Sequence, residues 1–324
     1  MAYISDLIKK NNVLNLNPPN DVSIHITQHG SDWLWTCFAI YSLSILVHVG
    51  FFFLTKRKTQ VFKRTLLGFP IYIHAVLAFA YFTMASNLGY APMTTEFNHA
   101  DINNDMVVGD DIRQLFYARY IAWFVAWPMV LTTIELSNHI VDFNTADTDL
   151  FTKIFSFAGN LFLKIIGTEL FVIGYLVGMF IHSTYKWGYF VFGTVGLLFS
   201  AYLVGYNTFI NTIGDLRAGR LQAGVIGFYL ITWILYPIAW GLSEGGNYIQ
   251  PDSEAVFYGI LDLVVFLVVP TALSWGLIRD VNEEFFKNVV GYDMRTDQEK
   301  IIETPRHSGD TAVPPMGVPT TEEA

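Results

Sequence analysis

The sequence is poor in charged residues and in cysteine. Only 15% of its 324 residues are Asp, Glu, Lys or Arg, whereas soluble domains carry about a quarter. The single cysteine, Cys37, lies in an apolar run, so a disulfide within the chain is excluded. Cys and His residues at metal-ligand spacing are also missing from the sequence. These absences argue against a soluble domain, a disulfide-stabilised fold and a metal site.

The sequence is acidic overall, and we expect no signal peptide at its N-terminus. Its net charge of −9 comes mostly from loops and tails, so nucleic acid is not expected as a partner. The first 31 residues hold no apolar core of the length that a secretory signal peptide needs. We therefore expect the first apolar run to act as its own signal-anchor.

Long apolar runs are abundant, and 52% of the residues are hydrophobic. Seven runs are long enough to cross a hydrocarbon core of ~30 Å as helices. They lie at about 33–54, 66–86, 116–136, 157–181, 187–210, 221–242 and 254–278. The sequence predicts an all-α membrane protein with an N-terminal segment at 1–32, a seven-helix domain at 33–278 and a mostly disordered tail at 279–324.

Lys and Arg are distributed unevenly among the connections between these runs. The first, third and fifth connections and the start of the tail carry Lys56, Arg57, Lys58, Lys63, Arg64, Lys153, Arg217, Arg220 and Arg279. The second and sixth connections are mainly acidic. Because cytoplasmic loops are enriched in Lys and Arg, we expect the N-terminus outside the cell and the C-terminus in the cytoplasm.

Asp262 lies deep in the seventh apolar run. A charge at that depth costs roughly 2.5–3.5 kcal/mol, so this side chain should face the protein interior and have a partner. Arg119, near the outer end of the third run, either pairs with Asp262 or extends outward to the membrane surface. We favour the pair, because an unpaired buried charge is costly.

Four further polar residues fall inside apolar runs. Lys164 and Glu169 are five residues apart in the fourth run, where their side chains either meet or Lys164 extends to the surface. Glu169 is expected to be a protonated, hydrogen-bonded interior group. His48 and His74 are expected to be satisfied core residues, with a proton relay as the alternative.

Three motifs in the third, sixth and seventh runs occur in order. They are Arg119-Tyr120-x-x-Trp123 with Pro128, Trp233-x-x-Tyr236-Pro237-x-x-Trp240 followed by Ser243-Glu244-Gly245, and Leu261-Asp262. Together they resemble the microbial rhodopsin family over about residues 33–278. Glu254 falls where the pumps of that family carry an outer-surface glutamate. The resemblance implies that the seven helices form a bundle of the microbial rhodopsin type.

The chain departs from the pigments of that family at the positions that carry their chemistry. The resemblance implies a lysine four residues after Asp262 that binds retinal as a Schiff base, and Phe266 stands there. It places the primary proton acceptor at Ala122 and the inner proton donor at Thr133. A Schiff base needs an amine. Covalent retinal and light-driven pumping are therefore not expected, and no cofactor is predicted.

Four further segments, at 23–37, 80–88, 182–189 and 245–252, look like the fungal opsin-related proteins, a subgroup that also lacks the lysine. That resemblance implies a stress-responsive, multi-pass protein of the plasma membrane. It implies restraint of the plasma-membrane proton ATPase, or a chaperone-like role in the membrane, and not catalysis by an enzyme. Besides the lipid bilayer and this ATPase, a second copy of the chain remains open as a partner.

Two other functions remain as alternatives. One is an ion or proton channel or transporter, whose candidate path residues are Arg119, Asp262, Glu244, Glu254 and Glu169. The other is a sensor of a non-covalent apolar ligand, a polyene or sterol, enclosed by Trp123, Trp233, Tyr236 and Trp240. Phe266 would instead fill that space if the remnant pocket has collapsed, as close-packed interiors favour.

Overall fold

The structure is a computed structural model of the chain, and it describes residues 11–56, 60–97, 111–145, 150–211 and 218–280. The predicted disorder of the tail beyond residue 280 lies outside the described residues. So do Arg57, Lys58 and Arg217, which contributed to the predicted orientation.

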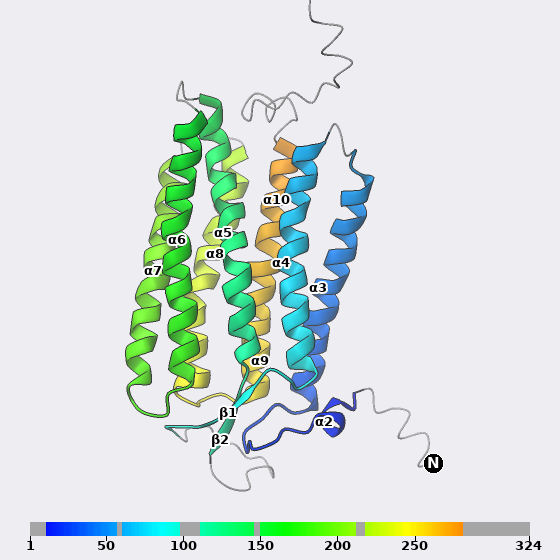
Figure 1. Ribbon diagram of the computed structural model, residues 1–324, viewed down its shortest axis with the longest axis vertical. Coiled ribbons are helices and arrows are strands. Elements are labelled where there is room, and N and C mark those ends of the chain that lie inside the picture. Colours follow the sequence, from blue (N-terminus) through cyan, green and yellow to red (C-terminus); the bar gives the residue numbers. More distant parts are fainter. Residues whose placement is uncertain (1–10, 57–59, 98–110, 146–149, 212–217, 281–324) are drawn as a thin grey trace, which may run out of the picture.

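Seven long helical segments run side by side through the described part of the chain (Figure 1). They are α3 (Gln28–Leu54), α4 (Val61–Ala85), α5 (Tyr117–Thr145), α6 (Leu150–Met179), α7 (Lys186–Asn211), α8 (Ala218–Trp240) and a seventh composed of α9 (Pro251–Asp262), η3 (Leu263–Val268) and α10 (Val269–Asp280). Each is long and apolar enough to cross a membrane, given the rise of 1.5 Å per residue. The predicted seven-helix bundle is confirmed.

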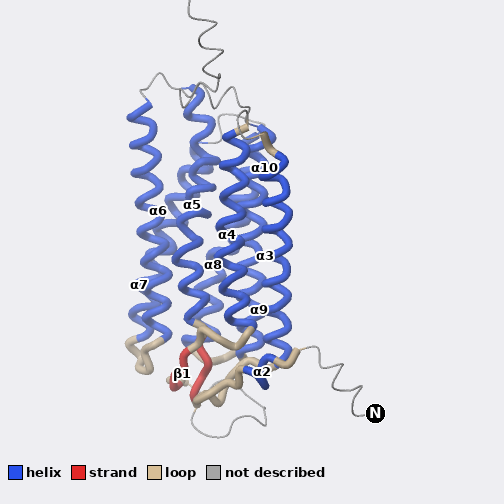
Figure 2. The backbone as a smooth tube through the Cα atoms, turned by 45° about the vertical axis from the view of Figure 1, so that its right-hand side comes forward, coloured by secondary structure: helices blue, strands red, loops and turns tan. Residues whose placement is uncertain are grey.

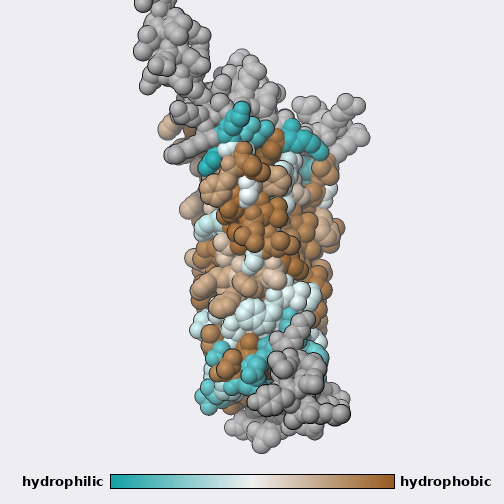
Figure 3. Space-filling model, turned by 90° about the vertical axis from the view of Figure 1, so that its right-hand side faces the viewer, coloured by the Kyte–Doolittle hydropathy of each residue, from teal (hydrophilic) through white to brown (hydrophobic). Residues whose placement is uncertain are grey.

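The outside of the bundle is apolar along most of its length. A broad hydrophobic band separates hydrophilic ends in the space-filling view of Figure 3. Large apolar side chains such as Leu46, Phe53 and Phe79 point outward, with 70–75% of their surface exposed. Water would disfavour so much contiguous apolar surface, so the lipid bilayer is the environment that fits this protein.

A small hairpin covers one end of the bundle (Figures 1 and 2). Strands β1 (Ala91–Thr94) and β2 (Ile112–Leu115) pair antiparallel, with Ala91 opposite Leu115. The short helix α2 (Val13–Leu16) lies at the same end. We call this the hairpin end, and the opposite end, where α3 and α10 finish, the far end. Strands of four residues are too short to show a reliable alternation, and the sequence did not predict them.

Two segments of wider, π-helical turns interrupt the sixth and seventh helices. Segment η2 (Gly241–Gly245) extends α8, and η3 begins directly after Asp262. Such turns are rare and occur frequently at functional sites. Here they displace the side chains that follow Trp240 and Asp262 from the positions of a regular α-helix.

Glycines allow α6 and α7 to approach each other closely. A Cβ atom on Gly196 would lie 2.5 Å from the carbonyl oxygen of Gly167, and one on Gly174 would lie 3.0 Å from the Cα of Gly193. Larger residues at these positions would force the two helices apart. Small residues at helix interfaces are typical of membrane proteins.

Candidate functional site

Asp262 is completely buried in the middle of the bundle and is held by three neutral donors. Tyr81 of α4 donates its hydroxyl to Oδ2 at 2.7 Å. Tyr236 of α8 and the indole Nε1 of Trp123 of α5 donate to Oδ1 at 2.8 and 3.0 Å. The carboxyl group thus joins four of the seven transmembrane segments, and hydrogen bonds to both of its oxygens compensate for lost hydration.

The expected ion pair between Arg119 and Asp262 is wrong. Arg119 instead places Nη1 2.8 Å from Glu254 Oε1 and 3.5 Å from Glu244 Oε1. Glu254 precedes Asp262 by about two turns on the same helix, and it meets the guanidinium first. Sequence reasoning recognised that each buried charge needs a partner, but it assigned the arginine to the deeper of the two carboxylates.

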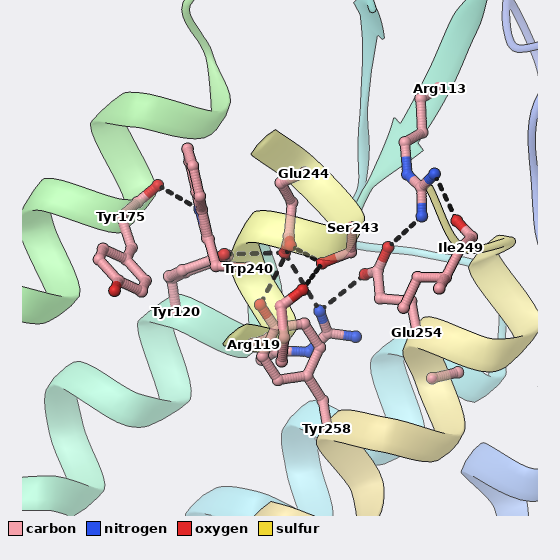
Figure 4. Close-up of polar contacts among 12 residues, drawn as sticks. Arg113, Arg119, Tyr120, Tyr175, Trp240, Ser243, Glu244, Ile249, Glu254 and Tyr258 are labelled. Carbon is pink, nitrogen blue, oxygen red and sulfur yellow. Dashed lines mark hydrogen bonds and ion pairs between the residues drawn. The ribbon is translucent and has the colours of Figure 1, made fainter. Parts of the chain in front are cut away.

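Two arginines and two glutamates form a buried charge cluster near the hairpin end (Figure 4). We define the charge cluster as Arg113, Arg119, Glu244 and Glu254. Arg113 places Nη2 2.7 Å from Glu254 Oε2 and donates from Nη1 to the carbonyl of Ile249 at 2.9 Å. All four side chains are at least nine-tenths buried. The formal charges of the cluster cancel, and the attraction between the partners offsets the desolvation penalty of burying four ionisable groups.

Glu244 is held by hydroxyl groups from three elements (Figure 4). Tyr120 of α5 donates to Oε1 at 2.8 Å, and Tyr258 of α9 donates to Oε2 at 3.0 Å. Ser243, its neighbour in η2, also donates to Oε2. The guanidinium carbon of Arg119 lies 4.1 Å from the centroid of the Tyr258 ring, a distance at which cations are attracted to aromatic faces.

Arg113 is the member of this cluster that sequence reasoning missed. It comes from strand β2, where its backbone pairs with Met93 and bridges to Ile24. In the sequence it is a single basic residue in an acidic connection, typical of a solvated loop. Only the pairing of two distant segments turns its side chain inward, so no local pattern signalled its position.

The remnant pocket proposed around Phe266 is occupied by aromatic rings. Phe266 is fully buried in η3, and its ring centroid lies 4.9 Å from that of Trp127. Trp127 also stacks on Trp233 at 5.8 Å and contacts Tyr236 at 5.3 Å. Trp123 and Tyr236 belong to the same group of rings, 5.0 Å apart.

Trp240, the fourth residue assigned to this pocket, packs elsewhere. Its indole Nε1 donates to the carbonyl of Tyr175, and its ring stacks on Phe190 at 5.2 Å. It therefore lies against α6 and α7, beside the charge cluster and not around Phe266 (Figure 4).

Lys164 does not meet Glu169, and the expected hydrogen bonds of Glu169 are also absent. Lys164 instead forms an ion pair with Glu135 of α5, and both side chains are almost completely buried. The two carboxyl oxygens of Glu169 are buried without a hydrogen-bond partner among the described residues. Glu135 is thus a second partner that sequence reasoning missed, because the pairing depends on how α5 and α6 align.

The comparisons with known proteins agree with this geometry. The sequence profile of the family described as bacteriorhodopsin-like protein matches residues 32–268. The chain belongs to this family. The 30 kDa heat shock protein of Saccharomyces cerevisiae is 37% identical over 323 residues, covering 96% of this chain and 94% of the relative. The opsin-like protein carO of Fusarium fujikuroi is 36% identical over 295 residues, covering 86% and 88%. The resemblance to fungal opsin-related proteins is confirmed.

Solved structures support the fold of this bacteriorhodopsin-like chain. The light-driven proton pump LR (Mac) from Leptosphaeria maculans superposes with a TM-score of 0.63 at 22% identity, covering 79% of this chain and 99% of that structure. The light-driven proton pump rhodopsin CsR of Coccomyxa subellipsoidea gives a TM-score of 0.62 at 23% identity, covering 78% and 98%. At this identity the likeness establishes the fold alone.

Proposed function

We propose that this protein is a non-photochemical opsin-like regulator that restrains proton export across the plasma membrane under stress. The observation that carries the proposal is Phe266, buried four residues after Asp262 and in ring contact with Trp127. A phenyl ring cannot form a Schiff base, so these residues do not fit covalently bound retinal. The scaffold then acts through a partner, for which the resemblance to opsin-related proteins points to the plasma-membrane proton ATPase.

Buried ion pairs at two depths hold the helices of the bundle together, which supports a role as a scaffold for a partner. The charge cluster joins α5, α9, η2 and β2 near the hairpin end, and Lys164 joins Glu135 between α5 and α6. Separating such pairs leaves uncompensated buried charge, which typically costs about 3–5 kcal/mol. A bundle held in this way is a rigid platform that presents its outer faces to another membrane protein.

Proton extrusion by cells after acid stress tests this proposal. Cells with the protein should extrude protons more slowly than cells without it, and the proton ATPase should co-purify with it in detergent from stressed membranes. An unrelated seven-helix protein at the same abundance is the control. Equal extrusion rates with and without the protein would contradict the proposal.

A proton or ion path is the second candidate, and the charge cluster together with Asp262 is the observation that favours it. These groups lie in the hairpin half of the bundle, which the Lys and Arg distribution predicts to face outward. The test is ion flux into liposomes, comparing the wild type with Asp262→Asn. Flux that does not differ between the two would exclude a path through Asp262.

A non-covalent apolar ligand is the third candidate, favoured by Trp233, whose buried indole N–H has no partner among the described residues. Such a ligand would have to separate Trp127 from Trp233 or from Phe266, whose rings are now in contact. Binding of a polyene or sterol would therefore change the fluorescence of these tryptophans. No change on titration would exclude this candidate.

A further inference from the structure

A polar group between α3, α4 and α10 takes no part in the site described above. His48 of α3 and His74 of α4 are both buried, with ring centroids 5.4 Å apart. Ser44 lies between them, its Oγ 3.3 Å from Nδ1 of His48 and 3.1 Å from Nδ1 of His74. We call these three residues the histidine site. His48 is less than two turns from the last residue of α3, Leu54, so the site lies nearer the far end than the hairpin end.

The contacts of His48 determine which of its nitrogens carries the proton. The indole Nε1 of Trp275, on α10, lies 3.2 Å from Nε2 of His48. An indole N–H only donates, so Nε2 accepts this bond and is unprotonated. Nδ1 then carries the proton and donates to the carbonyl of Ser44 at 2.8 Å. The bond between Trp275 and His48 therefore exists only in this neutral tautomer.

The contacts of His74 leave one of its nitrogens unused. Since Nδ1 of His48 already bears a proton, the Ser44 hydroxyl donates to Nδ1 of His74, which places the proton of His74 on Nε2. That Nε2 is buried and has no hydrogen-bond partner among the described residues. Burial opposes a positive charge on this ring, but the ring lies beside the carbonyls of Phe266 and Leu267 in η3. These carbonyls would bind an imidazolium more strongly than a neutral ring.

The short distance between the two rings limits the site to a single proton. The other titratable or charged groups around the site come from α3, α4 and α9: Cys37, Tyr41, Tyr81, Arg64 and Asp262. The ring of Tyr41 lies 5.9 Å from that of His74, and its buried hydroxyl is also unpaired among the described residues. Two imidazolium ions 5.4 Å apart would repel each other strongly at low dielectric constant.

We propose that the histidine site binds one proton from the far end of the bundle and that this proton releases Trp275 from His48. The incoming proton bonds to Nε2 of His48, whose lone pair Trp275 had occupied. The proton on Nδ1 of His48 moves to Oγ of Ser44, and the Ser44 hydroxyl proton moves to Nδ1 of His74. His48 ends neutral with its proton on Nε2, Ser44 is unchanged, and His74 carries the charge.

Protonation of the site depends on the pH on the side of the membrane where α3 and α10 end. The Lys and Arg distribution predicts that this side is the cytoplasm. Loss of the Trp275 bond loosens the contact between α3 and α10 at that end. The biological use of this signal rests on the proposed restraint of proton export. The proton site itself is tested on the purified protein, so failure of either proposal is recognised separately.

The experiment is nitrogen NMR of the full chain in lipid nanodiscs, with 15N in the histidine rings. His48→Gln and His74→Gln assign the signals, and His182→Gln, at an exposed histidine at the hairpin end, is the matched control. On acidification His48 should exchange its protonated nitrogen at the same pH at which His74 becomes doubly protonated. Replacement of His48 should displace the midpoint of His74 by at least about one pH unit. Unchanged neutral signals of both rings down to about pH 5, more than one unit below the ordinary histidine pKa, would overturn the proposal.

A second variant tests the release of Trp275 without removing either histidine. Trp275→Phe keeps an aromatic ring beside Phe51 but removes the N–H that competes for Nε2 of His48. The midpoint of the histidine site should then rise by roughly half a pH unit to one pH unit, the equivalent of one hydrogen bond. The control Trp35→Phe, at a tryptophan of α3 that contacts Phe38 and Phe82, should leave the midpoint unchanged. Equal midpoints in wild type and Trp275→Phe would contradict the release of Trp275.

Discussion

At the scale of the residue, Asp262 is held by neutral donors and Arg119 by carboxylates. This differs from the pair that the sequence predicted, although the prediction that both residues face the interior is consistent with their burial. Glu254 and Asp262 are both acidic, and they lie about two turns apart on the same helix. Either could meet Arg119, so the sequence alone could not choose between them. The choice depends on which carboxylate lies at the same depth in the bundle as the Arg119 guanidinium. Only the packing of the helices defines that depth.

Removal of a donor to Asp262 should destabilise the protein. Tyr81→Phe deletes the hydroxyl that lies 2.7 Å from Oδ2 and should lower the free energy of unfolding by about 1–3 kcal/mol. Unfolding in detergent, followed by circular dichroism, measures the change. Tyr202→Phe, at an exposed tyrosine of α7, should change it little. Equal effects of both substitutions would contradict the assigned role of Tyr81.

Arg113 and Glu254 should be energetically coupled, since their side chains are 2.7 Å apart and buried. A double-mutant cycle with Arg113→Met and Glu254→Gln should give a coupling energy of at least about 1.5 kcal/mol. Each single variant should be destabilised, because it leaves one buried charge without this partner. Stability changes that add to within about 0.5 kcal/mol would show that the two residues act independently.

At the scale of the element, apolar runs predicted all seven transmembrane segments, because each run exceeds what a soluble helix needs. The hairpin and the segments η2 and η3 were not predictable, since four-residue strands and single wide turns leave no periodic pattern. These unpredicted elements position much of the candidate site. Strand β2 brings Arg113 to Glu254, η2 carries Glu244, and η3 carries Phe266.

The close contact between α6 and α7 should make Gly196 intolerant of a side chain. Gly196→Ala puts a Cβ 2.5 Å from the carbonyl oxygen of Gly167 and should lower the thermal midpoint of unfolding. Gly159→Ala, on α6, meets nothing within 4 Å and should raise stability by up to about 1 kcal/mol through helix propensity. Thermal scans in detergent compare the two. The same direction of change in both variants would contradict this packing.

At the scale of the whole molecule, the chain keeps the rhodopsin bundle and carries Phe266 where the family resemblance places the retinal-binding lysine. The Asp262 site and the charge cluster preserve a polar interior, while Trp127 and Phe266 occupy the space between α5, α8 and η3 with rings. In the described residues this space is filled by the protein's own side chains. The proposed function places the functional surface on the apolar exterior and the ends of the bundle, and not in a light-absorbing centre.

The absorbance spectrum of the purified protein after addition of all-trans retinal tests this central claim most directly. The Phe266→Lys variant, alone and with Trp127→Ala to make room, supplies an amine near Asp262 as the comparison. For the wild type we expect only the band of free retinal, and no adduct after denaturation or borohydride reduction. A visible band from the wild type that persists after denaturation as a covalent adduct would contradict the account.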